Sequence, residues 1–195
     1  MVADAYRRLG ELAESEPNAV APTAVALLML GDIGLAQEQF DRAARRYQER
    51  LALEGLKGAW GPIDAQAGLA AVNFCTGNYV QSALLYRDSL GRAQDLSISL
   101  LVASTLLGLA GVAATSGRPE VGARLLGASE RIVGLLSVPI FPRDQPVRDR
   151  CLSALSAALG EQRLAAAREA GRALTQEGAI AEAEAVAQDV MRASA

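Results

Sequence analysis

The feature that most constrains this chain is a pattern of small and bulky residues that recurs at spacings of 39 and 40 residues. Each copy begins with a leucine and a small residue: Leu30-Gly31, Leu69-Ala70 and Leu109-Ala110. Twelve residues after the small one stands a second small residue, Ala43, Ser82 or Gly122, followed four residues later by Tyr47, Tyr86 or Leu126. Small residues let two helices cross closely, and a bulky residue one turn later fills the space before the next pair. The pattern therefore predicts stacked pairs of helices.

Helix-ending residues divide the chain in the same way. Pro62 and Pro119 suit a first helical turn, and Gly77 and Gly117 suit the end of a helix. Strand patterns and hairpin turns are missing from the sequence. These observations predict an all-α protein with helices at about residues 2–15, 23–37, 40–56, 62–76, 79–95, 98–116, 119–136, 145–159, 161–173 and 176–193.

The second unit carries the most complete motif. It combines Leu69-Ala70 with Gly77-Asn78-Tyr79 at the turn and with Ser82, Tyr86 and Ser89 on the second helix. This arrangement resembles the tetratricopeptide repeat. The first unit departs from that repeat at Glu38, where the turn glycine is expected, and at Arg50. The third unit has Pro119 in place of the turn aromatic.

The resemblance implies a right-handed superhelix of antiparallel helix pairs, a tetratricopeptide-like α-solenoid. We expect one domain over residues 1–195, with repeats at about 23–57, 62–96 and 101–136 and a degenerate C-terminal helical cap at 144–195. The period exceeds the usual tetratricopeptide length of about 34 residues, so HEAT-type repeats of about 40 residues are the structural alternative. The residues at the turns favour the tetratricopeptide interpretation.

The C-terminal third resembles a more specific class. The runs GRPE (117–120), ARLLGASE (123–130), AALGE (157–161) and AAAREAGRALT (165–175) are similar to the end of the helical-repeat region in MalT-like, LuxR-type bacterial transcriptional regulators and related signalling ATPases. In that family the repeat region is a sensor or scaffold that interacts with proteins, and catalysis and DNA binding belong to other domains. The resemblance implies a non-catalytic role of this kind. A stand-alone adaptor that binds an apolar helix or peptide is the alternative.

Composition removes several kinds of chemistry. The chain has 19 Lys and Arg against 22 Asp and Glu, a formal net charge of −3, and no His. Without His there is no Ser-His or Cys-His pair and no His-containing metal site. A phosphate-binding loop is also missing, since Lys57 precedes Gly58 rather than Ser or Thr. We expect no catalytic residue, metal or cofactor, and no nucleic-acid binding through this domain.

Two cysteines and the N-terminal residues bear on location. Cys75 and Cys151 are 76 residues apart and belong to no CxxC motif, so we expect reduced thiols. Residues 1–8 lack the apolar core of a signal peptide, which predicts a cytoplasmic protein. The uncharged segment 96–117 is long enough to cross a bilayer, but a fully buried helix in a stack has the same composition. We therefore expect no membrane span.

The charged residues allow three interpretations. Arg42, Arg45, Arg46 and Arg50 alternate with acidic residues, which predicts a solvated helix face. The same interpretation applies to a second group: Arg143, Asp144, Arg148, Asp149 and Arg150. Asp32 and Asp64 fall on the first helices of successive repeats. A plain surface role is expected first for them, then a binding groove, and last a carboxylate-only enzyme.

The repeat positions also define a concave groove. Its predicted lining is mostly small and apolar: Leu28, Asp32, Leu35, Asp64, Ala67, Ala71, Phe74, Cys75, Leu107, Gly111 and Thr115. Such a groove suits an apolar helix, either of a ligand or of the protein itself. The alternative is a narrow groove that neighbouring side chains fill.

The last helix carries an apolar stripe that includes Ile180, Ala183, Ala187 and Val190. A stack needs polar or covered ends, so this stripe has to pack against something. The expected partner is the helix at 161–173. If that surface is already used, a second copy of the chain becomes the alternative, so both a monomer and a homodimer are open.

Overall fold

The computed structural model describes residues 20–53 and 61–193, and all regular elements in these ranges are helices. They are α2 (Val20–Ala36), α3 (Phe40–Ala52), α4 (Gly61–Cys75), α5 (Tyr79–Asp95), α6 (Ser99–Thr115), α7 (Pro119–Leu136), α8 (Asp144–Arg172) and α9 (Gln176–Arg192). The predicted helix at 2–15 and the end of the one at 40–56 lie outside the described residues. The remaining predicted ranges match the observed helices closely, so the all-α expectation is confirmed.

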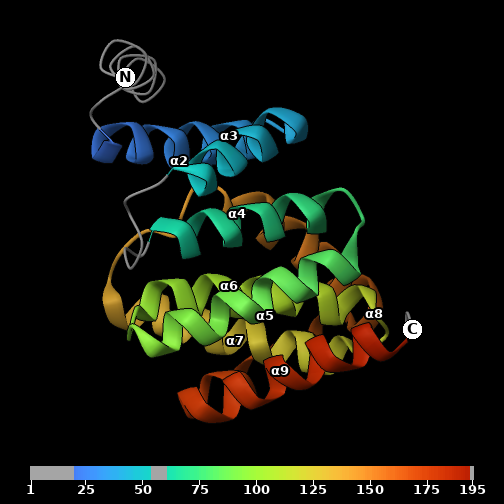
Figure 1. Ribbon diagram of the computed structural model, residues 1–195. Helices are drawn as coiled ribbons and strands as arrows, with labels where there is room; N and C mark the ends of the chain where they lie inside the picture. The colour runs from blue at the N-terminus through green and yellow to red at the C-terminus, as the bar shows by residue number, and fades with distance from the viewer. Residues whose placement is uncertain (1–19, 54–60, 194–195) are drawn as a thin grey trace.

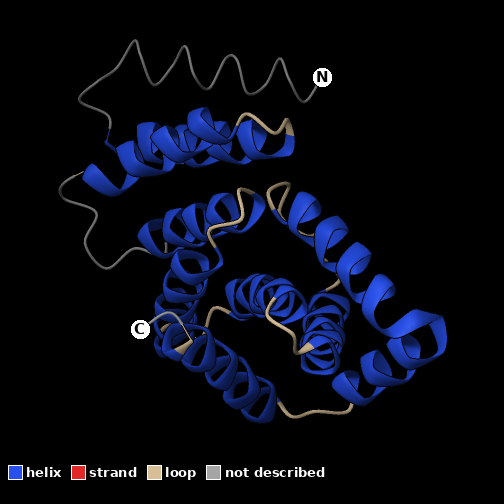
Figure 2. Cartoon of the chain, turned by 90° about the vertical axis from the view of Figure 1, so that its right-hand side faces the viewer, coloured by secondary structure: helices blue, strands red, loops and turns tan. Residues whose placement is uncertain are grey.

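Neighbouring helices pack against one another along the chain, as in an α-solenoid (Figure 1). Each of the pairs α2–α3, α4–α5 and α6–α7 is joined by a short turn and runs antiparallel. The pair α2–α3 lies at one end of the stack, and α9 lies at the other (Figures 1 and 2). Helix α8 packs on α6 and α7 and also reaches α4 and α2, so it closes one side of the stack.

The small residues of the repeat pattern meet where the sequence predicts. The Ser82 hydroxyl donates to the Ala70 carbonyl across the α4–α5 pair, at 2.9 Å. In the next pair, a Cβ added to Gly122 would lie 2.7 Å from the Ala110 carbonyl oxygen. Only glycine allows that approach of α6 to α7, because a real Cβ does not come so near a carbonyl oxygen.

The bulky residues of the pattern fill the space between pairs. Tyr47 is fully buried, and its ring packs against Gly31 of α2 and Gly68 of α4. Tyr86 is equally buried and packs against Gly108 of α6. Each tyrosine therefore bridges successive units of the stack, which explains why a chain so poor in aromatic residues keeps these two.

The turn between the two helices of each unit has the same geometry in all three units. Glu38, Gly77 and Gly117 have positive φ angles of 57°, 85° and 79°. The amide that follows each of them donates to a carbonyl five residues earlier, with distances of 2.7, 2.8 and 2.9 Å. This pattern closes the C-terminus of a helix. Glu38 thus adopts the left-handed conformation that glycine favours, and its departure from the motif leaves the turn unchanged.

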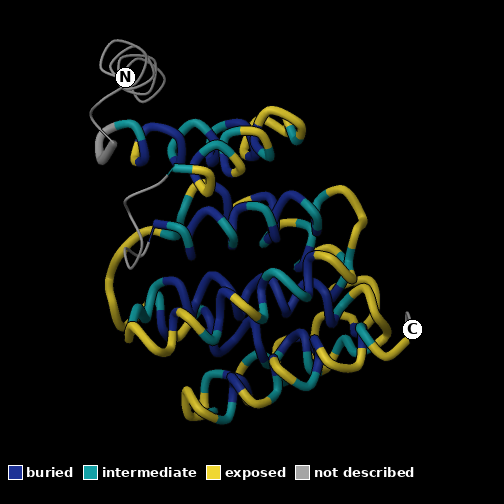
Figure 3. Tube along the Cα trace, viewed as in Figure 1, coloured by how far each residue is buried: buried dark blue, intermediate teal, exposed yellow. Residues whose placement is uncertain are grey.

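Helix α6 forms the centre of the molecule. Every residue from 101 to 113 is buried, and α6 contacts α4, α5, α7, α8 and α9 (Figure 3). This surrounding explains its uncharged sequence, since a helix covered on all sides needs no polar face. Among the described residues no helix is long and apolar enough to cross a membrane.

For the C-terminal helices, the predicted break in α8 is confirmed and the predicted packing of α9 is not. Helix α8 is broken at Gly160, whose φ of 70° and ψ of 169° are not helical, so the predicted division between 159 and 161 is confirmed. The prediction of the helix that packs against α9 was wrong. Its stripe is buried mainly against α5, with further contacts to α6 and α7, rather than on 161–173. Because the chain itself covers this stripe, the stripe gives no reason to expect a second copy.

Candidate functional site

The predicted groove is closed in the structure. Nine of its residues are buried, namely Leu28, Asp32, Leu35, Asp64, Ala67, Ala71, Phe74, Leu107 and Gly111. Cys75 is half-buried and Thr115 is exposed. Phe74 packs directly on Gly111, so part of the space between α4 and α6 is filled by a groove residue. This burial favours the two interpretations in which the protein itself fills the groove, by one of its own helices or by neighbouring side chains.

Arg143, the residue just before α8, makes the polar contacts inside the groove. Its guanidinium lies 3.3 Å from Asp32 Oδ1 and contacts Asp64 as well. It also stacks on the Phe141 ring, 4.2 Å from the ring centre. Arg143 is fully buried, so the prediction of a solvated face was wrong here. One cation on the irregular segment before α8 binds the two carboxylates of α2 and α4.

Two hydroxyls and a third carboxylate complete this buried cluster. Tyr47 donates to Asp32 at 2.8 Å, and Ser104 donates to Asp144 at the same distance. Asp144 lies 3.8 Å from the Arg143 Nε and is buried like it. The cluster therefore holds three carboxylates and one arginine side chain. Arg50 is buried too, against the start of α4, which corrects the solvated-face prediction for the last member of its stripe.

Burial controls the ionisation of the cluster. It raises the pKa of Asp144 to about 6, although Arg143 and the Ser104 hydrogen bond act in the opposite direction. Burial also raises the pKa of Asp32, against the effect of Arg143. For Arg143 itself, burial favours the neutral form, but the charges of the aspartates outweigh it and raise its pKa well above the ordinary value. Arg143 therefore stays charged, and its partners hold it in place.

The geometry of the cluster favours a structural role. Asp32 and Asp64, on which the catalytic alternative rested, both contact Arg143 in the interior. Both carboxylates are buried, whereas a general acid or base has to reach the proton of a bound substrate. The sequence contained a clue to this arrangement, because two carboxylates in an apolar groove require a cation.

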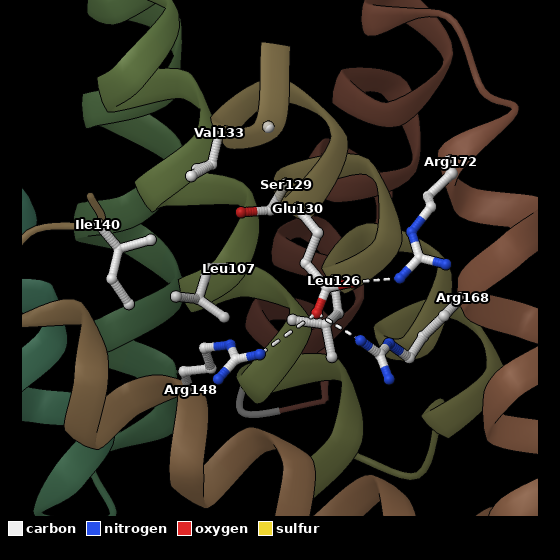
Figure 4. Close-up of a pocket in the computed structure, with 10 residues that line it drawn as sticks. Leu107, Leu126, Ser129, Glu130, Val133, Ile140, Arg148, Arg168 and Arg172 are labelled. Carbon is white, nitrogen blue, oxygen red and sulfur yellow. Dashed lines mark hydrogen bonds and ion pairs between the residues drawn. The ribbon is translucent and has the colours of Figure 1, made fainter. Parts of the chain in front are cut away.

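A second concave feature is open to solvent. It is a pocket of about 440 Å³ between α6, α7 and α8 (Figure 4). Its lining consists of Leu107, Leu126, Ser129, Glu130, Val133, Gly134, Ile140, Arg148, Arg168 and Arg172. Leu107 alone belongs to the predicted groove, so sequence reasoning missed this pocket.

Three arginines surround the Glu130 carboxylate in this pocket (Figure 4). Arg168 lies 2.6 Å from Oε1, and Arg172 lies 2.9 Å from Oε2. Arg148 is 3.7 Å from Oε1, beyond hydrogen-bond distance. The side chains of these arginines remain between 25% and 40% exposed, in contrast to Arg143. We call this group the arginine pocket.

The break at Gly160 brings the three arginines together. Arg148 and Arg168 are twenty residues apart in α8, which would separate them by about 30 Å in a straight helix. They reach the same carboxylate because the chain changes direction at Gly160. Arg168 and Arg172 have the i, i+4 spacing of one helix face, and this part of the site was visible in the sequence.

The cysteines take no part in either feature as reactive groups. Both are free, as predicted. Burial raises the pKa of Cys75 to about 11 and that of Cys151 to about 12. Both are therefore protonated thiols near neutral pH. The described residues contain no group of His, Cys, Asp and Glu side chains that could hold a metal ion.

Comparison of the chain with protein-family models, with curated proteins and with solved structures found no match. The class that the fold defines is therefore an all-α protein with a solenoid-like stack of helices. Any narrower assignment rests on the sequence resemblance and on the geometry of the two charged clusters.

Proposed function

We propose that this chain is a non-catalytic sensor or scaffold domain of a bacterial transcriptional regulator or signalling ATPase, built from tetratricopeptide-like helix pairs. The observation that carries the proposal is the closed inner face of the stack. Arg143 and the start of α8 occupy the groove that could otherwise receive a peptide. A stack closed in this way has a fixed shape, as a scaffold between other domains requires.

The closed groove also separates the proposal from the alternative of a stand-alone peptide adaptor. An adaptor of that kind needs an open concave surface, but nine of the eleven groove residues are buried. Partners in the proposed role are other domains of a larger chain or a separate protein, and they contact the outer faces. The same role needs no nucleic-acid contact, in keeping with the net charge of −3.

The reading frame that encodes this chain tests the proposal. A frame that continues into a phosphate-binding loop or a helix-turn-helix supports the regulator class. A frame that encodes only these residues would contradict it and favour a stand-alone protein. Fluorescence anisotropy with labelled duplex DNA at physiological salt tests the other part, and we expect no binding by this domain at micromolar concentration.

A further inference from the structure

We propose that the arginine pocket binds an organic anion with an apolar tail, such as a medium-chain carboxylate. This inference deepens the proposed sensor role, on which its biological meaning rests, by naming a ligand class. Its physical basis is independent of that role. It follows from the shape, the charge and the unused donors of the pocket.

The pocket combines apolar and charged groups, and Arg148 lies on the same side as Leu107 (Figure 4). Leu107, Val133 and Ile140 lie together on one side, and Arg168 and Arg172 lie on the other, with Glu130 between them (Figure 4). The volume of about 440 Å³ falls in the range of small-molecule sites, about 300–1,000 Å³. A ligand that matches both sides has a charged head and an apolar body.

The charge of the pocket favours an anion. Three arginines surround one carboxylate, and the further partner of Arg172 is Glu169, which is 2.8 Å away and three-quarters exposed. Positive charge therefore remains in excess even when Glu169 is counted. An anionic head group meets this excess, whereas a cation or a neutral polar ligand does not.

Hydrogen-bond donors are also available. Within the described residues the Arg148 guanidinium donates to no acceptor, and the Glu130 carboxylate, 3.7 Å away, is beyond hydrogen-bond distance. A carboxylate that accepts two parallel bonds from the Arg148 fork supplies the missing partner, since the planar guanidinium fits two oxygens.

The apolar lining decides between an organic carboxylate and a small inorganic anion. A free phosphate would satisfy the arginines but leave the partly exposed side chains of Val133 and Ile140 in contact with water. Burial of a hydrocarbon tail against them adds about 0.8 kcal/mol for each methylene group.

The charge of Glu130 should affect how tightly the proposed ligand binds. Its carboxylate accepts hydrogen bonds from Arg168 and Arg172 and holds both side chains in position. A ligand carboxylate bound to Arg148 lies close to the Glu130 carboxylate, and the two like charges repel each other. Removing the charge of Glu130 should therefore strengthen binding, whereas removing the charge of Arg148 should weaken it. Because non-specific attraction of an anion would change in the same two directions, the test also needs an arginine outside the pocket as a control.

Isothermal titration calorimetry of the full chain with octanoate at pH 7 and low salt tests the proposal. We expect saturable binding of octanoate. 1-Octanol lacks the charged head group and inorganic phosphate lacks the apolar tail, so each should bind at least about tenfold more weakly. The variant Arg148→Gln should weaken octanoate about tenfold or more. Glu130→Gln should strengthen it several-fold. The control Arg163→Gln, on the same half of α8 as Arg168 but outside the pocket, should stay within about twofold.

Several results would overturn the proposal. They are no saturable binding of octanoate, equal affinity for octanol or phosphate, or equal effects of Arg148→Gln and Arg163→Gln. Circular dichroism and thermal melts confirm that each variant is folded, which is expected because these arginines are partly exposed. Failure of octanoate binding leaves the reading-frame test of the scaffold role unaffected, so the two proposals fail separately.

Discussion

Two charged clusters in this molecule have opposite compositions and opposite surroundings. One buried arginine, Arg143, lies among three aspartates in the interior. One glutamate, Glu130, lies among three partly exposed arginines at the arginine pocket. Both use the same guanidinium–carboxylate chemistry. We infer from the comparison that burial, more than the identity of the groups, decides whether an ion cluster is a fixed structural contact or a place where partners can exchange.

The physical reason is the cost of leaving a charge alone. In the interior, water cannot replace a lost partner, and breaking a buried pair costs about 3–5 kcal/mol. At the surface, water and salt replace it, and an exposed pair contributes about 0–1 kcal/mol. A ligand can compete for Arg148, whereas no solvent molecule can compete for Arg143. The following predictions test this difference, from the largest effect to the smallest.

The variant Arg143→Met tests the interior cluster most directly. It leaves Asp32 and Asp64 buried without their cation, so the free energy of unfolding should fall by about 3–5 kcal/mol. Urea denaturation followed by circular dichroism measures this change. The matched control is Arg163→Met, an exposed arginine paired with Glu120, whose effect should stay below about 1 kcal/mol. A similar loss of unfolding free energy in the two variants would contradict the proposed difference between buried and exposed clusters.

The interior cluster should also give an unusual pH dependence. Burial raises the pKa of Asp144 to about 6 in the folded protein, whereas the ordinary value is 3.8. Between these values the folded state binds this proton more tightly than the unfolded chain does. The contribution of Asp144 to stability is therefore full below about pH 4 and is lost as the pH rises through 6, by up to about 3 kcal/mol.

Urea denaturation at pH 4.5 and pH 7 measures this dependence. The variant Asp144→Asn should flatten the profile, because its side chain does not titrate. Asp149→Asn, at an exposed position on the same helix, should leave the profile unchanged. Parallel profiles for wild type and Asp144→Asn would show that another group controls the pH dependence.

The variant Tyr47→Phe tests a single bond to the interior cluster. It removes the hydroxyl that donates to Asp32 at 2.8 Å and keeps the ring between Gly31 and Gly68. A hydrogen bond to a buried charged group contributes about 1.5–3 kcal/mol, and the unfolding free energy should fall by that amount. Thermal or urea denaturation measures the loss. Tyr79→Phe is the control, because the described residues offer the Tyr79 hydroxyl no partner, and we expect almost no change for it.

The smallest effect on stability is expected at the arginine pocket. Glu130→Gln removes the central charge, yet its three partners remain in contact with water. The unfolding free energy should change by no more than about 1 kcal/mol, even though this residue contacts three arginines. Chemical denaturation at two salt concentrations gives the change and its screening. A loss as large as that of Arg143→Met would place this cluster in the same structural class.

The sequence by itself determined the local structure. The small and bulky residues of the repeat, the turn at residues 77 and 117 and the break at Gly160 were all predicted, and the helices follow them. These features depend on residues close together in the chain, where backbone preference and helical periodicity act directly. Even Glu38, which departs from the motif, sits in a turn that its neighbours specify.

Tertiary structure decided which distant groups meet. Arg143 lies 111 residues from Asp32 and 79 from Asp64, and only the docking of α8 across the stack brings them together. The same holds for α9, whose stripe was predicted but whose partner α5 was not. An arginine beside an aspartate has the same local sequence in a solvated turn and in a buried cluster. The difference in free energy between these two surroundings comes from the helices that pack around the arginine. No single segment of the chain determines that packing.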